Sequence, residues 1–351
     1  MMTESISGNQ TGKASQGSLL AINDTSHFYR EFCRGLGFEP PDKEINNASN
    51  SLVGLLEELW GGNVEIIPME TIQTTMSDQI RKFEGEESGV LHIALDPAFN
   101  PYGVRVLDIN RLSSPNGMFR GYGPRQGAIP IKAQLEEIRE EAWELGITEN
   151  VLIDDVSVTA GTILLVKELL NRIGLRTKGV VLGIATGQAV RNLSNEGIEV
   201  VTSLTTEAGH VVNTRDLIPI NTRGGAVVDE SSVPCNQQGI ILRPPYPTSP
   251  QTIYLRRTHE WTGLPLSEVV EFSRQLWEIG AGFHSALSTC RDIQLRELNE
   301  VQSGYPGVPS PDSESSHFNV AIPIAEVISD GLRFMKGIPV RHIVYSYPGK
   351  R

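Results

Sequence analysis

Two adjacent carboxylates, Asp154 and Asp155, are the side chains of this sequence best suited to chemistry. They follow an apolar run, Val151 to Ile153, of the kind that forms a buried β-strand. Neighbouring carboxylates at the end of a strand can accept hydrogen bonds from sugar hydroxyls, and their oxygens can hold a divalent cation. The pair is therefore a candidate site for a polyol or for a metal ion.

A loop of small and hydroxyl-bearing residues follows the acid pair and leads into an amphipathic helix predicted over residues 163–173. Small side chains let backbone amides approach a ligand closely, and hydroxyl groups add further donors. Free amides at a helix N-terminus, together with the helix dipole, favour an anion such as a phosphate monoester. The predicted phosphate-binding residues are Ser157, Val158, Thr159, Ala160, Gly161 and Thr162.

Strands and helices alternate around this segment, which predicts a parallel sheet with crossover helices and hence an α/β fold. The predicted helices lie at residues 132–146, 163–173 and 188–195, and the predicted strands at 151–153, 179–185 and 198–204. Helical spacing of apolar residues dominates before residue 89, and a further helix is predicted from residue 266.

These patterns divide the chain into four parts. They are a disordered leader (1–18), an N-terminal helical segment that could form a hood (19–88), an α/β core (89–230) and a C-terminal α+β extension (231–351).

The composition excludes several classes of protein. Among 351 residues, 42 Asp and Glu outnumber 30 Lys and Arg, for a formal net charge of -12. Nucleic-acid binding requires positive charge on at least one face, so we expect no nucleic-acid partner. No apolar run approaches the roughly 20 residues of a spanning helix, so we expect no membrane partner. The widely spaced Cys33, Cys235 and Cys290 fit neither a disulfide framework nor a zinc site, which indicates a reducing cytoplasm.

Residues 151–162 resemble the motif with which type I phosphoribosyltransferases bind phosphoribosyl pyrophosphate (PRPP): an apolar strand, two acids and a Thr/Gly loop. The likeness extends over residues 89–206. It implies a mostly parallel sheet of phosphoribosyltransferase type with α+β additions at both ends. It also implies transfer of a 5-phosphoribosyl group from PRPP to a nitrogen of a nucleobase or similar heterocycle, with release of pyrophosphate. Mg²⁺ is the implied cofactor, and PRPP, a small-molecule acceptor and a second copy in a homodimer are the implied partners.

The resemblance also implies roles for individual residues. Asp154 and Asp155 would hold the ribose hydroxyls and, together with pyrophosphate, a metal ion. The pyrophosphate loop would contain Asp96 and Asn100. The catalytic loop would be the Gly- and Pro-rich stretch 110–130, whose cations, which would meet the developing pyrophosphate, are Arg111, Arg120 and Arg125.

The sequence departs from the family pattern at two positions of the loop. Val158 stands where many members have an acid or a threonine, and Ala160 stands at the usual glycine position. Alanine resists positive φ, so this substitution bears on the geometry of the phosphate site.

Several alternatives remain open at this point. The acid pair and loop could be an ordinary strand-to-helix turn in which these side chains serve as caps. The chain could be a regulator that binds PRPP without turnover, or an enzyme that processes a ribosyl phosphate in a specialised or defence pathway. The stretch 110–130 could be a mobile lid or a disordered insertion, and Arg215 and Asp216 could line the site or belong to a turn.

Overall fold

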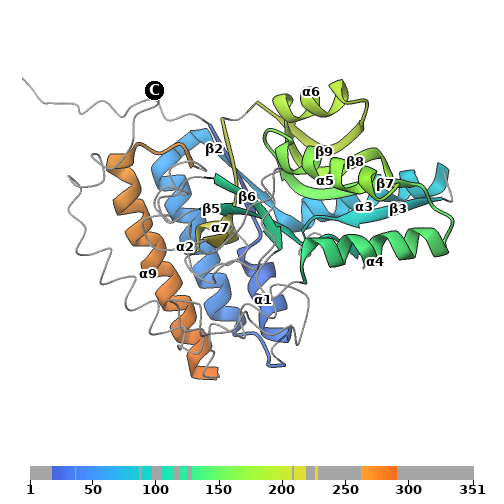
Figure 1. The fold of residues 1–351 in the computed structure, drawn as a ribbon. Helices are drawn as coiled ribbons and strands as arrows, with labels where there is room; N and C mark the ends of the chain where they lie inside the picture. Colours follow the sequence, from blue (N-terminus) through green and yellow to red (C-terminus); the bar gives the residue numbers. More distant parts are fainter. Residues whose placement is uncertain are drawn as a thin grey trace, which may run out of the picture.

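A five-stranded, fully parallel sheet forms one half of the protein (Figure 1). The structure is a computed structural model that describes residues 18–35, 37–86, 89–96, 104–113, 119–124, 129–207, 209–218, 226–227 and 262–290. In spatial order, the strands are β4 (Arg105–Val106), β3 (Val90–Ala94), β7 (Glu149–Ser157), β8 (Arg176–Thr186) and β9 (Glu199–Thr206).

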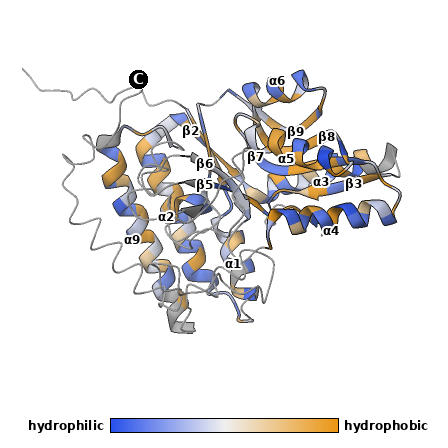
Figure 2. Cartoon of the chain, in the orientation of Figure 1, coloured by the Kyte–Doolittle hydropathy of each residue, from blue (hydrophilic) through white to orange (hydrophobic). Residues whose placement is uncertain are grey.

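Helices cover both faces of this sheet, which explains the continuous apolar runs inside its inner strands, such as Val151 to Ile153 in β7 and Val180 to Leu182 in β8. In β7, Leu152 packs toward one helical layer, whereas Val151 and Ile153 pack toward the other, as successive side chains of a strand must. Figure 2 shows the apolar faces of these helices turned toward the sheet. One layer contains α4 (Ile131–Glu144), α5 (Gly161–Arg172) and α6 (Gly187–Asn195), and the other contains α3 (Met69–Glu86).

A second parallel sheet contains strands from distant parts of the chain. Its order is β10 (His210–Asn213), β1 (Leu19–Asn23) and β2 (Val64–Pro68); the short helices η1 (Gly61–Asn63) and α7 (Thr214–Leu217) precede β2 and follow β10. The side chains of β1 alternate: Leu20 and Ile22 face the α3 layer, whereas Leu19 and Ala21 face the other way. The two sheets thus share the apolar layer around α3.

The opposite face of the second sheet is covered by what we call the helical cluster. Its core includes the buried rings of Phe28, Tyr29, Phe272 and Phe283. The helices that supply this core are α1 (Thr25–Gly35), α2 (Asp42–Trp60) and α9 (Leu266–Cys290). None of the described helices is both long and apolar enough to cross a membrane.

The prediction that residues 110–130 form a loop without regular structure is wrong. This stretch contains an antiparallel hairpin of β5 (Ile109–Ser113) and β6 (Phe119–Pro124), and β11 (Ala226–Val227) pairs in parallel with β5. Strands are recognised in a sequence by alternating apolar and polar side chains, and the glycines within β6 interrupt this alternation. The hydrogen bonds between β5 and β6 join backbone groups, so the hairpin forms without the pattern. The remaining prediction for this stretch, mobility, falls partly on residues 114–118 and 125–128, which lie outside the described residues.

The predicted alternation of strands and helices between residues 131 and 206 is confirmed, as is an α/β fold with mostly parallel sheets. The N-terminal segment contains the expected helices but also β1, which was not predicted. The four-part division of the chain stays a prediction. The leader up to residue 17 and most of the C-terminal extension lie outside the described residues.

Candidate functional site

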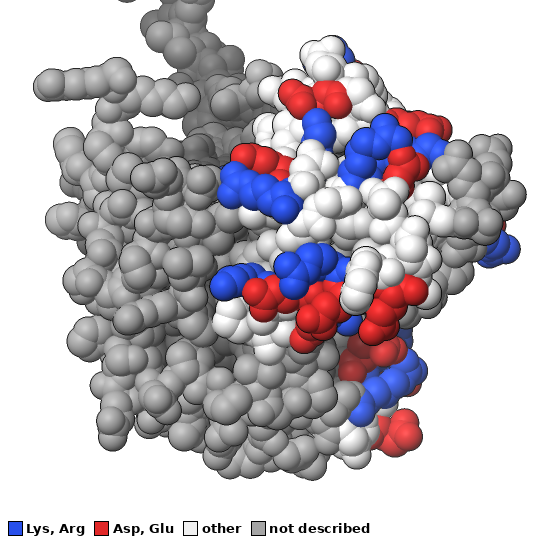
Figure 3. Space-filling model, turned by 45° about the vertical axis from the view of Figure 1, so that its right-hand side comes forward, with Lys and Arg blue, Asp and Glu red and all other residues white. Residues whose placement is uncertain are grey.

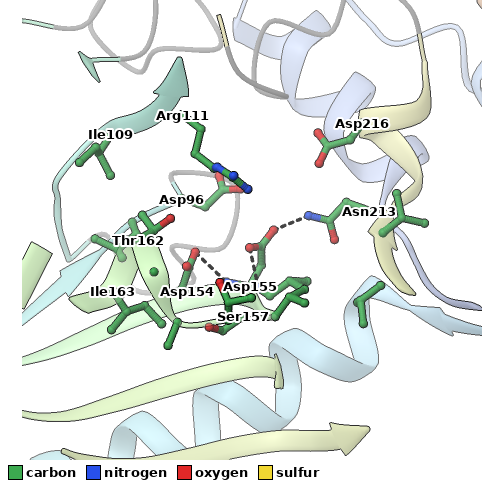
Figure 4. Close-up of a pocket in the computed structure, with 18 of the residues that line it drawn as sticks. Asp96, Ile109, Arg111, Asp154, Asp155, Ser157, Thr162, Ile163, Asn213 and Asp216 are labelled. Carbon is green, nitrogen blue, oxygen red and sulfur yellow. Dashed lines mark hydrogen bonds between the residues drawn. The ribbon is translucent and has the colours of Figure 1, made fainter. Parts of the chain in front are cut away.

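A cavity of about 330 Å³ opens at the carboxyl ends of β3 and β7 (Figure 4). The chain places β4 on one side of β3 and β7 on the other, so the strand order reverses at this point. Ligands of open α/β sheets bind in the crevice outside the strand ends at such a reversal. The location therefore marks a candidate ligand site on topology alone.

The loop between β7 and α5 contains a left-handed residue. Ala160 has φ 63° and ψ 7°, and it is the one non-glycine residue with positive φ in the described part of the chain. This conformation costs an alanine roughly 1–2 kcal/mol, and strain of this kind concentrates at functional sites. The alanine thus adopts the conformation for which a glycine is usual.

Helix α6 and the residue before it are hydrogen-bonded to the loop between β7 and α5. The Thr186 hydroxyl donates a hydrogen bond to the Val158 carbonyl at 2.6 Å and accepts one from the Ala189 amide at 3.2 Å, which caps α6. The Asn192 amide group donates to the Thr159 carbonyl at 3.0 Å. The loop carbonyls are therefore bonded to α6.

At the start of α5, no side chain caps the backbone amides, since Ala160 occupies the N-cap position. The first amides of a helix have no partner within the helix, and the helix dipole adds positive potential there. The walls of the cavity include all six predicted phosphate-binding residues, 157–162. This end of the cavity is suited to an anion.

The two acids of the pair have different surroundings. Asp155 is 8% exposed, and its Oδ1 accepts a hydrogen bond from the Val156 amide at 2.6 Å. Its Oδ2 accepts one from Arg215 Nη2 at 3.0 Å and another from the Asn213 amide group. Asp154 is only partly buried, and its Oδ1 accepts a bond from the Asp155 amide at 3.1 Å. Both acids line the cavity.

One guanidinium group joins the acids of both sheets, an arrangement that we call the ionic junction. Arg215, 2% exposed, pairs with Asp24 at the end of β1 (Nη1 to Oδ2, 3.0 Å), Asp96 after β3 and Asp155 in β7. The Arg215 amide also donates to Asp24 Oδ1 at 2.9 Å. Asp216 lines the cavity beside this group, with its Oδ1 3.8 Å from Arg215 Nε. The ionic junction is defined as Arg215 with Asp24, Asp96 and Asp155.

Burial shifts the protonation of these groups. It raises the pKa of Asp24 to about 6 and that of Asp216 to about 7, against the opposing attraction of Arg215. Burial and the nearby Asp96 also raise the pKa of Asp155. Burial alone would lower the pKa of Arg215, but Asp96, Asp24, Asp216 and Asp155 together raise it well above its usual value. The guanidinium thus stays charged, while Asp24, Asp155 and Asp216 hold protons more readily than ordinary carboxyl groups do.

The structure brings most of the predicted residues together. Asp96, Arg111, the acid pair and residues 157–162 all line the cavity. The backbone of Arg120 lies in β6, but its side chain is not described, and Asn100 and Arg125 lie outside the described residues. The roles given to all of these residues stay predictions.

Other residues of the site were missed or left open. Asp24 and Asn213 were not predicted, although Asp24 stands two residues after an apolar run, Leu19 to Ile22, in a position comparable to that of Asp154. Arg215 and Asp216, for which two interpretations stood open, line the cavity. Tyr122 was also missed; it lies directly opposite Arg111 in the β5–β6 hairpin, so both side chains lie on the same face.

Among the described residues, there is no group of three or more His, Cys, Asp or Glu side chains that could hold a metal ion. On the face shown in Figure 3, Lys and Arg side chains are interspersed with Asp and Glu side chains. The expectation of no nucleic-acid partner stays a prediction.

Comparisons with known proteins gave few matches. No family model matches the chain, and no curated protein matches it. Among solved structures, the crystal structure of TT1426 from Thermus thermophilus is similar at 13% identity and a TM-score of 0.27, over 39% of this chain and 84% of that chain.

Proposed function

We propose that this protein binds PRPP in the cavity and transfers its 5-phosphoribosyl group to a nitrogen of a heterocyclic acceptor, with release of pyrophosphate. One observation carries the proposal. A single cavity lies where the strand order of the sheet reverses. It is lined by the acid pair, by the loop that contains the left-handed Ala160 and is hydrogen-bonded to Thr186, and by the uncapped start of α5. A sugar phosphate presents the matching groups, since its hydroxyls need acceptors and its phosphate needs amide donors.

In this assignment, the 5-phosphate lies against residues 157–162 and the ribose hydroxyls lie at the acid pair. The pyrophosphate extends toward Arg111 on the hairpin, where a cation meets the charge that develops on the leaving group. The protein contributes positioning and electrostatics rather than a covalent intermediate.

The residues present fit Mg²⁺ bound together with the substrate. Mg²⁺ commonly binds through one or two carboxylates and substrate phosphates, and Asp154 supplies a carboxylate at the cavity. Asp155, the other predicted ligand, already accepts hydrogen bonds at both oxygens. When bound, Mg²⁺ would neutralise pyrophosphate charge as the anomeric bond breaks.

The proposal is tested by calorimetry with PRPP and Mg²⁺. Wild-type protein should bind, and Asp154→Asn should bind about 10- to 100-fold more weakly, because a hydrogen bond to a charged group contributes about 1.5–3 kcal/mol. Glu168→Gln, an exposed acid on α5 paired with Arg172, is the matched control and should bind as the wild type does. Absence of PRPP binding by the wild type would exclude the proposed function.

A second function, a PRPP-binding regulator without turnover, has one observation in its favour. Val158 lines the cavity with 42% of its surface exposed, at a position where the resemblance would put an acid or a threonine. The apolar side chain of Val158 cannot take up a proton from the heterocycle that receives the phosphoribosyl group. Pyrophosphate release in the presence of a panel of nucleobases separates the two functions, since only the enzyme releases pyrophosphate.

A further inference from the structure

We propose that Arg215 is a positioning residue that divides the acid pair: it holds Asp155 in the floor of the cavity and leaves Asp154 as the acid that contacts the ribose. This inference rests on the proposed function and sharpens it. It differs from the expectation drawn from the resemblance, in which both acids hold the ribose hydroxyls.

The hydrogen bonds of Asp155 carry the first step of the argument. Its two oxygens accept three hydrogen bonds from the protein, from the Val156 amide, the Asn213 amide group and Arg215. A carboxylate has about four acceptor positions, so most of the capacity of Asp155 is used within the protein. Asp154 is more exposed and lies at the cavity wall, on the side of Thr162 in Figure 4.

The geometry of Arg215 carries the second step. A guanidinium is planar and presents its donors in a fixed fork, so each partner is held in a definite direction. Nη2 of Arg215 bonds both Asp96 and Asp155, and Nη1 lies 3.0 Å from Asp24. Asp155 therefore cannot turn toward a ligand without losing its hydrogen bond to the same Nη2 that holds Asp96.

The third step is the support of Arg215 from the second sheet. Asp24, fully buried, lies outside the cavity lining, yet it contacts both the guanidinium and the backbone amide of Arg215. The hydroxyl of Thr214 bonds Asp24 as well, at 3.2 Å. The orientation of Arg215, and through it that of Asp155, is thus set by a residue that no cavity ligand can touch.

If the pairing of Asp24 with Arg215 served only the stability of the fold, a different result would be expected. Loss of Asp24 would then lower the free energy of unfolding but would leave the affinity of the folded protein unchanged. Under the positioning role, the same change lets Arg215 shift, disorders the cavity floor and weakens the binding of the ligand. The affinity of folded protein is therefore the deciding measurement.

The experiment measures the Kd for PRPP with Mg²⁺ by calorimetry on Asp24→Asn, under conditions where circular dichroism shows the variant folded. We expect affinity to fall about tenfold, the loss of roughly one hydrogen bond to a charged group. Ser49→Ala is the matched control, because it removes a polar contact to Asn23 (2.9 Å) at the end of the same strand, away from Arg215. It should bind PRPP within about twofold of the wild type.

A second variant and a double-mutant cycle complete the test. Arg215→Lys keeps the charge but replaces the rigid fork of guanidinium donors with a single nitrogen, so it should also bind PRPP about tenfold more weakly. This variant answers the question if Asp24→Asn fails to fold. Asp24→Asn and Asp155→Asn should be non-additive because both act through Arg215, whereas Asp24→Asn and Asp154→Asn should be additive.

Wild-type affinity in folded Asp24→Asn and in Arg215→Lys would overturn the positioning role while leaving the proposed function intact. Additive effects of Asp24→Asn and Asp155→Asn would overturn it too. If the wild type itself does not bind PRPP, the proposed function fails and this inference fails with it.

Discussion

The ionic junction and the helical cluster bury polar groups in contrasting ways. In the ionic junction, Arg215 is in contact with three acids that lie in or just after strands of two sheets, and the site borders a cavity. In the helical cluster, His284 is 2% exposed and packs beside aromatic rings, with centroids 5.9 Å from Tyr29 and 5.3 Å from Phe283. The ionic junction thus buries charged groups beside the cavity, where they can shape a binding site. The helical cluster instead packs apolar side chains around the neutral ring of His284.

The stability of the ionic junction and the adjacent Asp216 consequently responds to pH with the opposite sign to that of the helical cluster. Burial raises the pKa of Asp24 to about 6 and that of Asp216 to about 7, so the folded state binds these protons more tightly than the unfolded state does. Their contribution to the free energy of unfolding falls as pH rises from about 4 to about 7. Burial lowers the pKa of His284 to about 3, so its contribution falls as pH drops below 6.5.

The largest expected effect is that of Arg215→Met, which removes the charge from the ionic junction. Three buried acids then lack their counter-ion, and we expect the free energy of unfolding to fall by about 4 kcal/mol. Arg274→Met is the control from the helical cluster: Arg274 pairs with Glu271 and Glu278 on the surface of α9, and its loss should cost about 0.5 kcal/mol or less. Urea denaturation measures both, and equal costs would remove the contrast between the two regions.

Phe283→Ala tests the helical cluster as a scaffold. Truncation of this buried ring should lower the free energy of unfolding by about 3 kcal/mol through lost burial and a residual cavity. Because Phe283 does not line the cavity, the Kd for PRPP should stay within about twofold of the wild-type value. A large change in affinity would show that the helical cluster also shapes the site.

His284→Leu sharpens the difference in pH response. Between pH 7 and pH 5, the wild type should lose about 2 kcal/mol relative to the variant, because the unfolded state gains a proton that the folded state resists. Asp216→Asn should give the opposite sign over the same interval. Urea denaturation at the two pH values provides the comparison, and a pH-independent difference between His284→Leu and wild type would contradict it.

The smallest effect concerns strain at the site. Ala160→Gly relieves the left-handed alanine and should raise the free energy of unfolding by about 0.5–1 kcal/mol. Ala142→Gly within α4 should lower it by about 1 kcal/mol, since there the backbone is helical and glycine is unfavourable. The same exchange thus has opposite signs at the two positions, and thermal unfolding detects both.

Local patterns predicted the alternating core because each parallel strand is apolar and each crossover helix is amphipathic. They also singled out residues 157–162, predicted to bind phosphate, because that loop is continuous in sequence; these residues line the cavity, and their role stays a prediction. The ionic junction could not be predicted in this way, because Arg215 is separated from Asp24 by 191 residues, from Asp96 by 119 and from Asp155 by 60. Such contacts depend on how two sheets meet, which no local periodicity encodes.

The pairing of β1 with β10 has a consequence for the order of assembly during synthesis. Leu19 in β1 pairs with His210 in β10, so β1 cannot complete its sheet until β10 has been synthesised. At 5–20 residues per second, the 190 residues between Asp24 and Thr214 take about 10–40 s to emerge from a ribosome. All five strands of the central sheet precede β10 in the chain and can pair during that interval. The nascent protein can therefore form the five-stranded sheet first, and the floor of its cavity closes only when Arg215 has been synthesised.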